Sequence, residues 1–359
     1  MTGASLAAER PATPVAVRVW LYVLAALVVA MVIIGGATRL TDSGLSITEW
    51  RPVTGAVPPL SEEAWATEFA KYRITPQYEL QNRGMSLSEF KEIYWWEWGH
   101  RFLGRLVGIV FALPLVWFLM RRELPRRMLP GLLVIFGLGA LQGAIGWWMV
   151  ASGLVDRTSV APYRLAVHLT LAFVILAALL WTARSARGVE PVEVPARIRA
   201  GAWIVLGLAF LQVALGALVA GLDAGRTFTT WPLIDGGLVP PADSLFVLRP
   251  AWTNLFENPL TAQFTHRMGA YVLFAVALLH ALDARRLGGK VARMAVLLFG
   301  VVVLQAVIGI VTLVEAAPIG LALLHQLGAV GVIAHAVAHV QRLAGPAAAM
   351  LPAAEIRAA

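Results

Sequence analysis

The sequence contains no cysteine among its 359 residues, and charged side chains make up only 14% of it. Without cysteine no disulfide, iron–sulfur cluster, thiolate zinc site or c-type haem attachment can form, so metal ligands must come from His, Asp, Glu or Met. Soluble domains average about 25% charged residues, whereas this chain is 59% hydrophobic with a mean hydropathy of +0.73. The composition excludes a disulfide-stapled secreted domain and a disordered chain, and it argues against a soluble enzyme.

Long apolar runs dominate the chain instead. A helix needs about 20 apolar residues to cross roughly 30 Å of hydrocarbon. Eight segments meet this requirement: 17–37, 101–120, 128–150, 164–183, 200–220, 265–283, 294–314 and 319–340. The first segment is too long for a removed signal peptide and lacks its small-residue cleavage pattern, so we count it as a span. We therefore expect an all-α polytopic membrane protein with eight transmembrane helices.

Basic residues mark one side of the expected topology. They precede the first span and lie between spans two and three, four and five, and six and seven: Arg10, Arg18, Arg121, Arg122, Arg126, Arg127, Arg184, Arg187, Arg197, Arg199, Arg285, Arg286, Lys290 and Arg293. The positive-inside rule makes this side cytoplasmic and places both termini there. The net charge of +8 reflects this distribution, so we attribute it to topology and do not expect nucleic-acid binding.

The two halves of the chain repeat the same motifs. Asp-x-Gly-x3-Thr-x-Trp occurs at 42–50 and 223–231, each followed by Gly-x-Val-Pro-Pro, and Leu-Gln-x2-Ile-Gly occurs at 141–146 and 304–309. Four spans per half give both halves the same orientation, so we expect two tandem four-helix bundles related as parallel repeats. The predicted units are an N-terminal bundle with a long outer loop, a cytoplasmic linker and a C-terminal bundle: 1–183 (loop 38–99), 184–199 and 200–359.

Four of the seven histidines follow this repeat and lie near the outer ends of spans two, four, six and eight: His100, His168, His266 and His325. A polar residue inside a span is costly and suggests function. Imidazole is a good ligand for haem iron, and imidazoles from two facing helices can bind the iron from both sides. We expect one haem in each half, between His100 and His168 and between His266 and His325.

Residues around these histidines fit a haem site. Gly104 and Gly108 lie one and two turns past His100 and leave room for a flat macrocycle. Three arginines near the outer face could neutralise haem propionates: Arg101, Arg105 and Arg267. A lone histidine in a membrane helix more often forms an interhelical hydrogen bond, but the duplication at matched depth favours ligation. Zinc or non-haem iron stays open, although such helix-borne sites usually add carboxylates, which only span two offers.

The remaining histidines have no counterpart in the repeat and lie toward the cytoplasmic ends of their spans: His280, His335 and His339. His335 and His339 have i, i+4 spacing and could together bind a metal. Hydrogen bonding at the interface is the more common role for such residues.

The two halves differ one turn before the first histidine of each pair. Glu97 precedes His100, whereas Gln263 precedes His266. An ionisable group beside one histidine and a neutral amide beside the other predict a division of labour. The N-terminal site would be reactive, with Glu97 as a catalytic group, and the C-terminal pair would hold a passive cofactor. The alternative is that Glu97 only pairs with Arg101 at i, i+4.

Segments 35–50 (GGATRLTDSGLSITEW), 52–59 and 89–101 (EFKEIYWWEWGHR) closely resemble the haem A synthase family, in particular its cysteine-free branch in alphaproteobacteria and mitochondria. The resemblance implies an oxidoreductase of the bacterial inner membrane. It would oxidise the C8 methyl group of haem O to a formyl group, giving haem A for cytochrome oxidase assembly.

The resemblance also implies roles for the histidines. His266 and His325 would ligate a resident haem b, while His100 and His168 with Glu97 would form the substrate site, holding substrate, product or both. The same role makes membrane lipid, haem O synthase, other oxidase assembly factors and a second copy of the chain candidate partners.

Two other function classes would use the same four histidines. A di-haem b electron-transfer subunit would need neither Glu97 nor a haem-modifying activity, and a haem-delivery protein would bind haem without altering it. Mass analysis of the haems extracted from the purified protein distinguishes these classes from a synthase.

The topology can be tested with reporter fusions. Fusions after residues 125, 190 and 289 should report the cytoplasm, because arginines flank these positions, and fusions near residues 70, 157 and 240 should report the outer side. Activity of a cytoplasmic reporter at an outer position would contradict the common depth of the four histidines.

Overall fold

The computed structural model describes residues 13–188 and 191–343, and their regular structure is helical apart from one isolated β-bridge, Ile234 to Gly237. Residues 1–12, 189–190 and 344–359 lie outside this description. They include Arg10, part of the predicted linker and both chain ends, so the predicted location of the termini falls outside the described residues.

In the described part of the chain, eight helices are long and apolar enough to cross a membrane. They are α1 Val15–Leu40, α4 Leu87–Met120, α5 Leu129–Gly153, α6 Pro162–Ser185, α7 Ala196–Gly221, α11 Pro259–Arg285, α12 Gly289–Val314 and α13 Ile319–Leu343. The expected all-α fold with eight spans is confirmed, and the chain is a multi-pass membrane protein.

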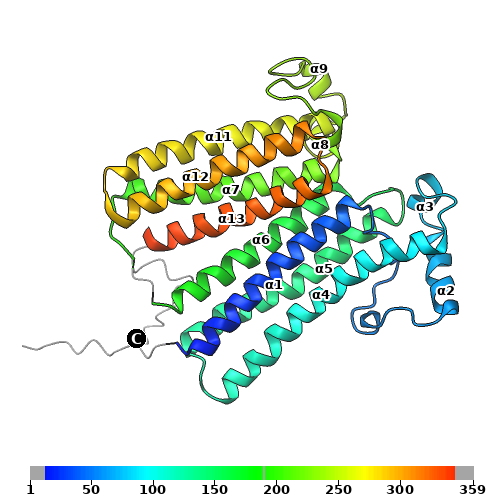
Figure 1. Ribbon diagram of the computed structural model, residues 1–359, viewed down its shortest axis with the longest axis horizontal. Coiled ribbons are helices and arrows are strands. Elements are labelled where there is room, and N and C mark those ends of the chain that lie inside the picture. Colours follow the sequence, from blue (N-terminus) through cyan, green and yellow to red (C-terminus); the bar gives the residue numbers. More distant parts are fainter. Residues whose placement is uncertain (1–12, 189–190, 344–359) are drawn as a thin grey trace, which may run out of the picture.

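The long helices form two groups of four that lie side by side (Figure 1). In the first group α1 packs against α4 and α6, and α5 packs against α6; in the second group α7 packs against α11 and α13, and α12 packs against both of these helices. The groups meet where α6 contacts α7 and α13, and where α1 contacts α13. One hydrophobic core runs through both groups and includes Leu21, Phe173, Ile198 and Leu298. The two predicted units therefore share their core.

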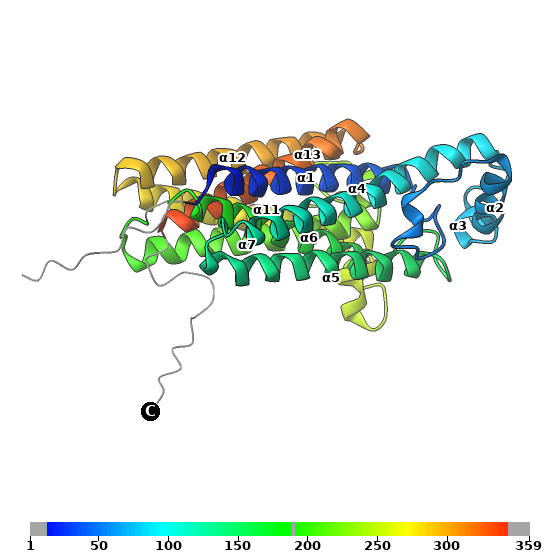
Figure 2. The same cartoon turned by 90° about the horizontal axis from the view of Figure 1, so that it is seen from below.

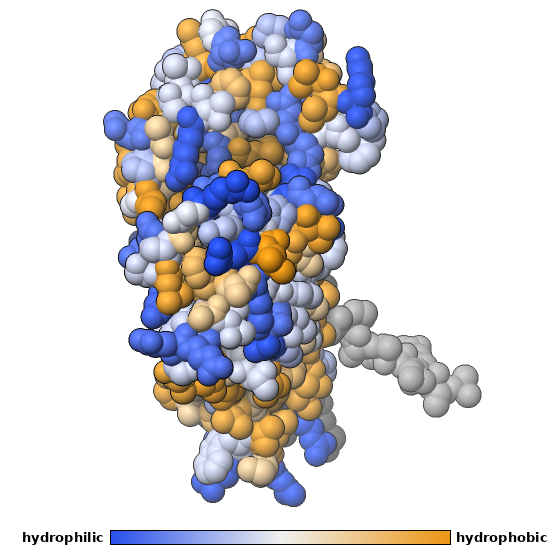
Figure 3. All heavy atoms as spheres, turned by 90° about the vertical axis from the view of Figure 1, so that its right-hand side faces the viewer, coloured by the Kyte–Doolittle hydropathy of each residue, from blue (hydrophilic) through white to orange (hydrophobic). Residues whose placement is uncertain are grey.

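Short helices gather at one end of the molecule, which we call the loop end (Figures 1 and 2). They are α2 Glu62–Tyr72, α3 Pro76–Leu80, α8 Ala224–Thr227, α9 Ala242–Leu245 and α10 Asn254–Glu257, with 3-10 turns at Thr54–Ala56 and Ala251–Thr253. A further 3-10 turn, Arg126–Met128, precedes α5 at the opposite end. Figure 3 looks onto the loop end and shows polar side chains interspersed with apolar ones.

Helix α4 begins earlier than the sequence suggested. The segment 38–99 was expected to be a loop, but it contains α2, α3 and the first turns of α4. A capping box starts α4, with the Ser86 hydroxyl accepting from the Glu89 amide and the Glu89 carboxylate accepting from the Ser86 amide. Phe90 then stacks on Phe69 of α2 with ring centroids 4.9 Å apart. His100 consequently lies well inside a helix whose outer turns project beyond the bundle (Figure 2).

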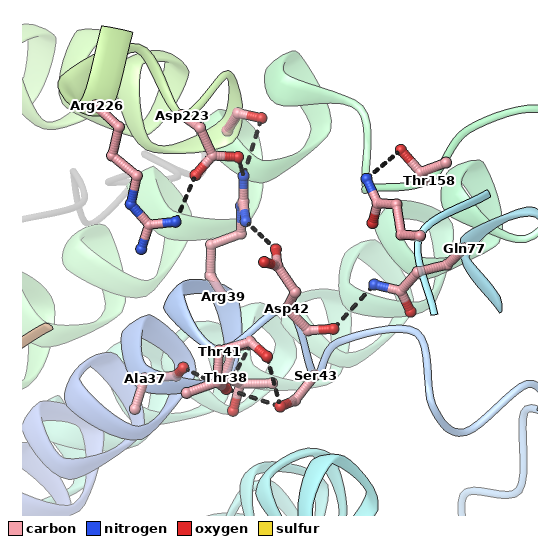
Figure 4. A network of polar contacts seen from close by, with 12 residues as sticks. Ala37, Thr38, Arg39, Thr41, Asp42, Ser43, Gln77, Thr158, Asp223 and Arg226 are labelled. Atoms are coloured by element: carbon pink, nitrogen blue, oxygen red, sulfur yellow. Dashed lines mark hydrogen bonds and ion pairs between the residues drawn. The ribbon is translucent and has the colours of Figure 1, made fainter. Parts of the chain in front are cut away.

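An arginine joins the two halves at the loop end (Figure 4). Arg39 at the end of α1 donates to the Asp42 carboxylate at 2.8 Å and also forms an ion pair with Asp223 from the second half. Asp42 and Asp223 occupy matching places in the repeat and share a left-handed backbone, with φ of 51° and 50°. One guanidinium thus binds the same motif in both halves.

The buried aromatic cluster that packs the start of α4 against α2 and α3 gives a stability test. It consists of Trp65, Tyr72, Tyr78, Phe90 and Tyr94. Phe90 is fully buried, so Phe90→Ala should leave a cavity costing about 3–5 kcal/mol in this layer and expose residues 41–86 to protease. Ile74→Ala, at a side chain 83% exposed, is the control and should leave the cleavage rate unchanged. Equal protease resistance in both variants would show that the aromatic cluster does not stabilise the segment 41–86.

Candidate functional site

Each of the four repeat histidines lies against a glycine of a neighbouring helix. The pairs are His100 with Gly35, His168 with Gly146, His266 with Gly216 and His325 with Gly309. A Cβ built on these glycines would lie from 2.7 Å (Gly309) to 3.1 Å (Gly216) from the imidazole, which is closer than real Cβ contacts normally come. The glycines belong to α1 and α5 in the first half and to α7 and α12 in the second. Equivalent helices therefore form equivalent cradles in the two halves.

The fold places the two histidines of each expected pair in one bundle. His100 of α4 and His168 of α6 belong to the first group of helices, and His266 of α11 and His325 of α13 belong to the second. The members of each pair lie on two different helices, as ligation of one haem from both sides would need. That each pair shares one haem stays a prediction.

Three glutamines support these histidines, and sequence reasoning did not assign them a role. Each amide Nε2 donates to the backbone carbonyl of one histidine and lies within 3.4 Å of a ring nitrogen: Gln142 with His168, Gln212 with His266 and Gln305 with His325. Their Oε1 atoms are buried without a hydrogen-bond partner in the described part of the chain. A polar residue inside an apolar span was the signal that could have identified them.

His100 lacks such a glutamine. The repeat aligns Gly35 with Gly216, so Met31 takes the place of Gln212. Within residues 13–188 and 191–343, no side chain or backbone group hydrogen-bonds the imidazole of His100. The first histidine of the N-terminal pair is therefore held by packing alone.

The donor set fits a haem better than another metal centre. Two imidazoles per half, glycine cradles and the buried, unpartnered Nδ1 of His168 suit a flat macrocycle ligated from both sides. Zinc and non-haem iron sites commonly take three or more protein ligands. No group of three His, Asp or Glu side chains arranged to hold a metal occurs among the described residues.

Glu97 points toward the outer connection. Its side chain is buried, and Oε2 accepts from the Ser46 hydroxyl at 2.7 Å and from the Ile47 amide at 2.8 Å. Its other oxygen, Oε1, accepts from the Arg101 guanidinium at 2.6 Å. The ion pair that the sequence offered as an alternative role is therefore present, and the carboxylate makes no hydrogen bond to His100.

Gln263 occupies the same place with the opposite hydrogen-bond polarity. Its amide Nε2 donates to the carbonyls of Ala224 at 2.7 Å and Phe228 at 3.0 Å, while its Oε1 accepts from Arg267 at 2.7 Å. Glu97 meets donors from its loop, whereas Gln263 meets acceptors. The difference between the halves thus matches the loop that each residue faces.

The three arginines predicted for propionates mainly hold the outer connections. Arg101 donates to the carbonyl of Ile47 at 2.8 Å, Arg105 to that of Pro52 at 2.7 Å, and Arg267 to that of Thr230 at 2.8 Å. Two of them retain a buried nitrogen that has no partner in the described residues, Nη1 of Arg105 and Nε of Arg267. Those two atoms are the donors still available to an anionic group.

The other histidines form hydrogen bonds, which was the more common of their two expected roles. His280 of α11 and His339 of α13 share a buried hydrogen bond of 2.8 Å between their Nε2 atoms. His335 instead bonds through Nδ1 to the carbonyl of Gly331 at 2.9 Å. His339 therefore pairs across helices and does not form an i, i+4 site with His335.

Two neighbouring helices of the N-terminal half, α4 and α5, pack less closely than their counterparts α11 and α12. Helices α11 and α12 pack closely, and Phe274 meets Phe299 across them with centroids 5.2 Å apart. The repeat places Gly108 at the position of Phe274, and a Cβ built there would meet nothing within 4 Å. Helices α4 and α5 contact each other over few residues. An aromatic contact also crosses α4 and α5, between Phe111 and Phe136 with ring centroids 5.3 Å apart, so the difference between the halves lies in the empty space at Gly108 and the smaller contact between α4 and α5.

The chain matches the family model described as cytochrome oxidase assembly protein over residues 18–337. Proteins named haem A synthase are similar over nearly their whole length. The one from Azorhizobium caulinodans is 56% identical over 94% of this chain and 96% of its own. Those of Bradyrhizobium sp. BTAi1 and Rhodopseudomonas palustris BisA53 are 54% and 53% identical, covering 96% and 98% of both chains respectively. With its paired histidines in both halves, the chain belongs to the haem A synthase family of cytochrome oxidase assembly proteins.

Proposed function

We propose that this chain is a haem A synthase that oxidises the C8 methyl group of haem O to a formyl group for cytochrome oxidase assembly. The observation that carries the proposal is the pair of histidines on glycine cradles in each half, in a family whose relatives bear that name. The basic connections opposite the loop end support an inner-membrane protein with those connections in the cytoplasm.

We assign different haems to the two pairs. His266 and His325 would hold a resident haem b, because α11 and α12 pack closely and Phe274 occupies the place that Gly108 leaves open in the first half. His100 and His168 would hold the substrate haem, since the looser contact between α4 and α5 lets a flat, apolar molecule enter from the lipid. When bound, haem b supplies an electron acceptor within the same helical core.

Balanced with water as the oxygen donor, conversion of one methyl to one formyl group releases four electrons and four protons. It proceeds in two two-electron oxidations, first to a hydroxymethyl group and then to a hydrated aldehyde that loses water. The electrons would leave through the haem b site to an acceptor outside the chain. The protein must orient the porphyrin edge and exclude bulk solvent while protons leave the reacting carbon. The glycine cradles make room for both imidazoles of the N-terminal pair, and the loop above them is held through Ser46, Ile47 and Arg101. A carboxylate in this low-dielectric layer can accept a proton or stabilise positive charge on the porphyrin edge, and Glu97 is the candidate.

The identity of the resident haem is testable. His266→Ala or His325→Ala removes one axial ligand, so a low-spin haem b spectrum should become high-spin or disappear. His335→Ala is the control, because the ring of His335 hydrogen-bonds to the carbonyl of Gly331 in its own helix. An unchanged spectrum in both ligand variants would exclude this pair as the cofactor site.

The role of Glu97 requires a comparison of variants. Glu97→Gln keeps the size but removes the charge, and we expect the ratio of haem A to haem O in membranes to fall by about two orders of magnitude. Ser46→Ala removes one loop hydrogen bond and leaves the carboxylate, so it should retain most activity. Gln263→Glu places a carboxylate against the carbonyls of Ala224 and Phe228, so it should lower stability. It should leave the ratio of haem A to haem O nearly normal for the protein that folds.

These variants separate catalysis from loop anchoring. Equal losses in Glu97→Gln and Ser46→Ala would reduce Glu97 to an anchor of the outer loop. If a strain that makes haem O accumulates no haem A with the unaltered chain, while the protein still carries haem b, the di-haem electron-transfer function replaces the proposed one.

A further inference from the structure

We propose that Gln212 is a positioning residue that makes the C-terminal pair retain its haem, and that Met31, at the matching place, lets the N-terminal pair exchange its haem. The inference rests on the proposed function, since it assumes that both pairs bind haem. It explains how two nearly identical sites in one chain can serve as a permanent cofactor site and a turnover site.

Gln212 contacts both the backbone and the ring of His266. Its Nε2 donates to the His266 carbonyl at 2.9 Å and lies 2.9 Å from the ring Nδ1. A Cβ built on Gly269 would lie 2.6 Å from the Gln212 Oε1 atom, so this glycine makes room for the amide. The packing of α7 against α11 therefore fixes the position of the Gln212 side chain.

The amide oxygen of Gln212, Oε1, makes no hydrogen bond in the contact between α7 and α11. It is buried and has no hydrogen-bond partner among residues 13–188 and 191–343. An amide offers a donor at one end and an acceptor at the other. The donor end, Nε2, serves the His266 carbonyl and lies beside Nδ1, so Oε1 is turned toward Gly269. The hydrogen bond to the His266 carbonyl and the contact of the amide with the ring hold the backbone and the imidazole of His266 in one orientation.

The four histidines differ in this support. Gln142, Gln212 and Gln305 each hold one of them, but Met31 stands where a glutamine would hold His100. A thioether donates no hydrogen bond and is flexible. The C-terminal pair therefore presents two oriented rings and the N-terminal pair only one. The ring of His100 must lose more orientational freedom on binding iron, so its site should bind haem more weakly.

The consequence suits an enzyme that acts on haem. A substrate site must release its product, whereas a cofactor site must not lose its haem between turnovers. Hydrogen-bonding partners of metal ligands typically change metal affinity by about 10–100-fold, and we expect an effect of that size at each site.

The test measures haem release from the purified full-length protein to excess apomyoglobin. The protein comes from a strain that makes haem O, and chromatography with mass analysis distinguishes the N-terminal haem (O or A) from haem b in the released and retained fractions. Gln212→Met should speed release of haem b about 10–100-fold and change the electron paramagnetic resonance of its low-spin iron. Met31→Gln should slow release of haem O or A by a similar factor.

Leu211→Met is the matched control, because it introduces the same side chain at the neighbouring, lipid-exposed position of α7. Its release rates should equal those of the unaltered protein. Unchanged haem b release and spectrum in Gln212→Met would overturn the inference, and so would an equal acceleration in Leu211→Met. If Gln212→Met does not accumulate, Met31→Gln decides alone, and unchanged release there overturns the inference.

Failure of the proposed function gives a different pattern. A low-spin haem b that disappears in His325→Ala but is released normally from Gln212→Met contradicts only the role of Gln212. Protein without haem, or with a spectrum indifferent to His266 and His325, contradicts the haem sites and this inference together.

Discussion

The contact between a histidine ring and a glycine of the next helix is the constraint on which the rest of the structure depends. An imidazole inside an apolar bundle needs space that a neighbouring side chain would fill. Gly35 and Gly146 provide it in the first half, and Gly216 and Gly309 provide it in the second. Because any Cβ would collide with the ring, these glycines set how closely the helices approach and at which height they pack.

The connections at the loop end contact both sites through the same arginine position but through a different neighbouring side chain. Arg101 and Arg267 each bind backbone carbonyls of their loop and the side chain one turn earlier. In the first half that side chain is Glu97, which accepts from its loop; in the second it is Gln263, which donates. The same helical position thus carries a charge only where the surrounding groups are donors that can stabilise it.

Several features could be predicted from the sequence for clear physical reasons. The eight spans follow from the length of apolar segments, and the assignment of two of the repeat histidines to each bundle follows from their matched places in the repeat. The early start of α4 was missed, because its outer turns are polar and depend on packing of Phe90 against α2. The partner of His339 was missed as well, since its i, i+4 neighbour, His335, suggested another site, whereas the bond goes to His280 on a different helix.

The sequence by itself determined the spans, the duplication and the identity of the candidate ligands, because hydropathy and spacing are properties of short segments. Only the tertiary structure decided which polar atoms meet. Ser46 and Ile47 lie far from Glu97 along the chain, and Gln212 lies equally far from His266. A buried hydrogen bond depends on ångström-scale distances between separate helices, which their packing sets and no local pattern encodes.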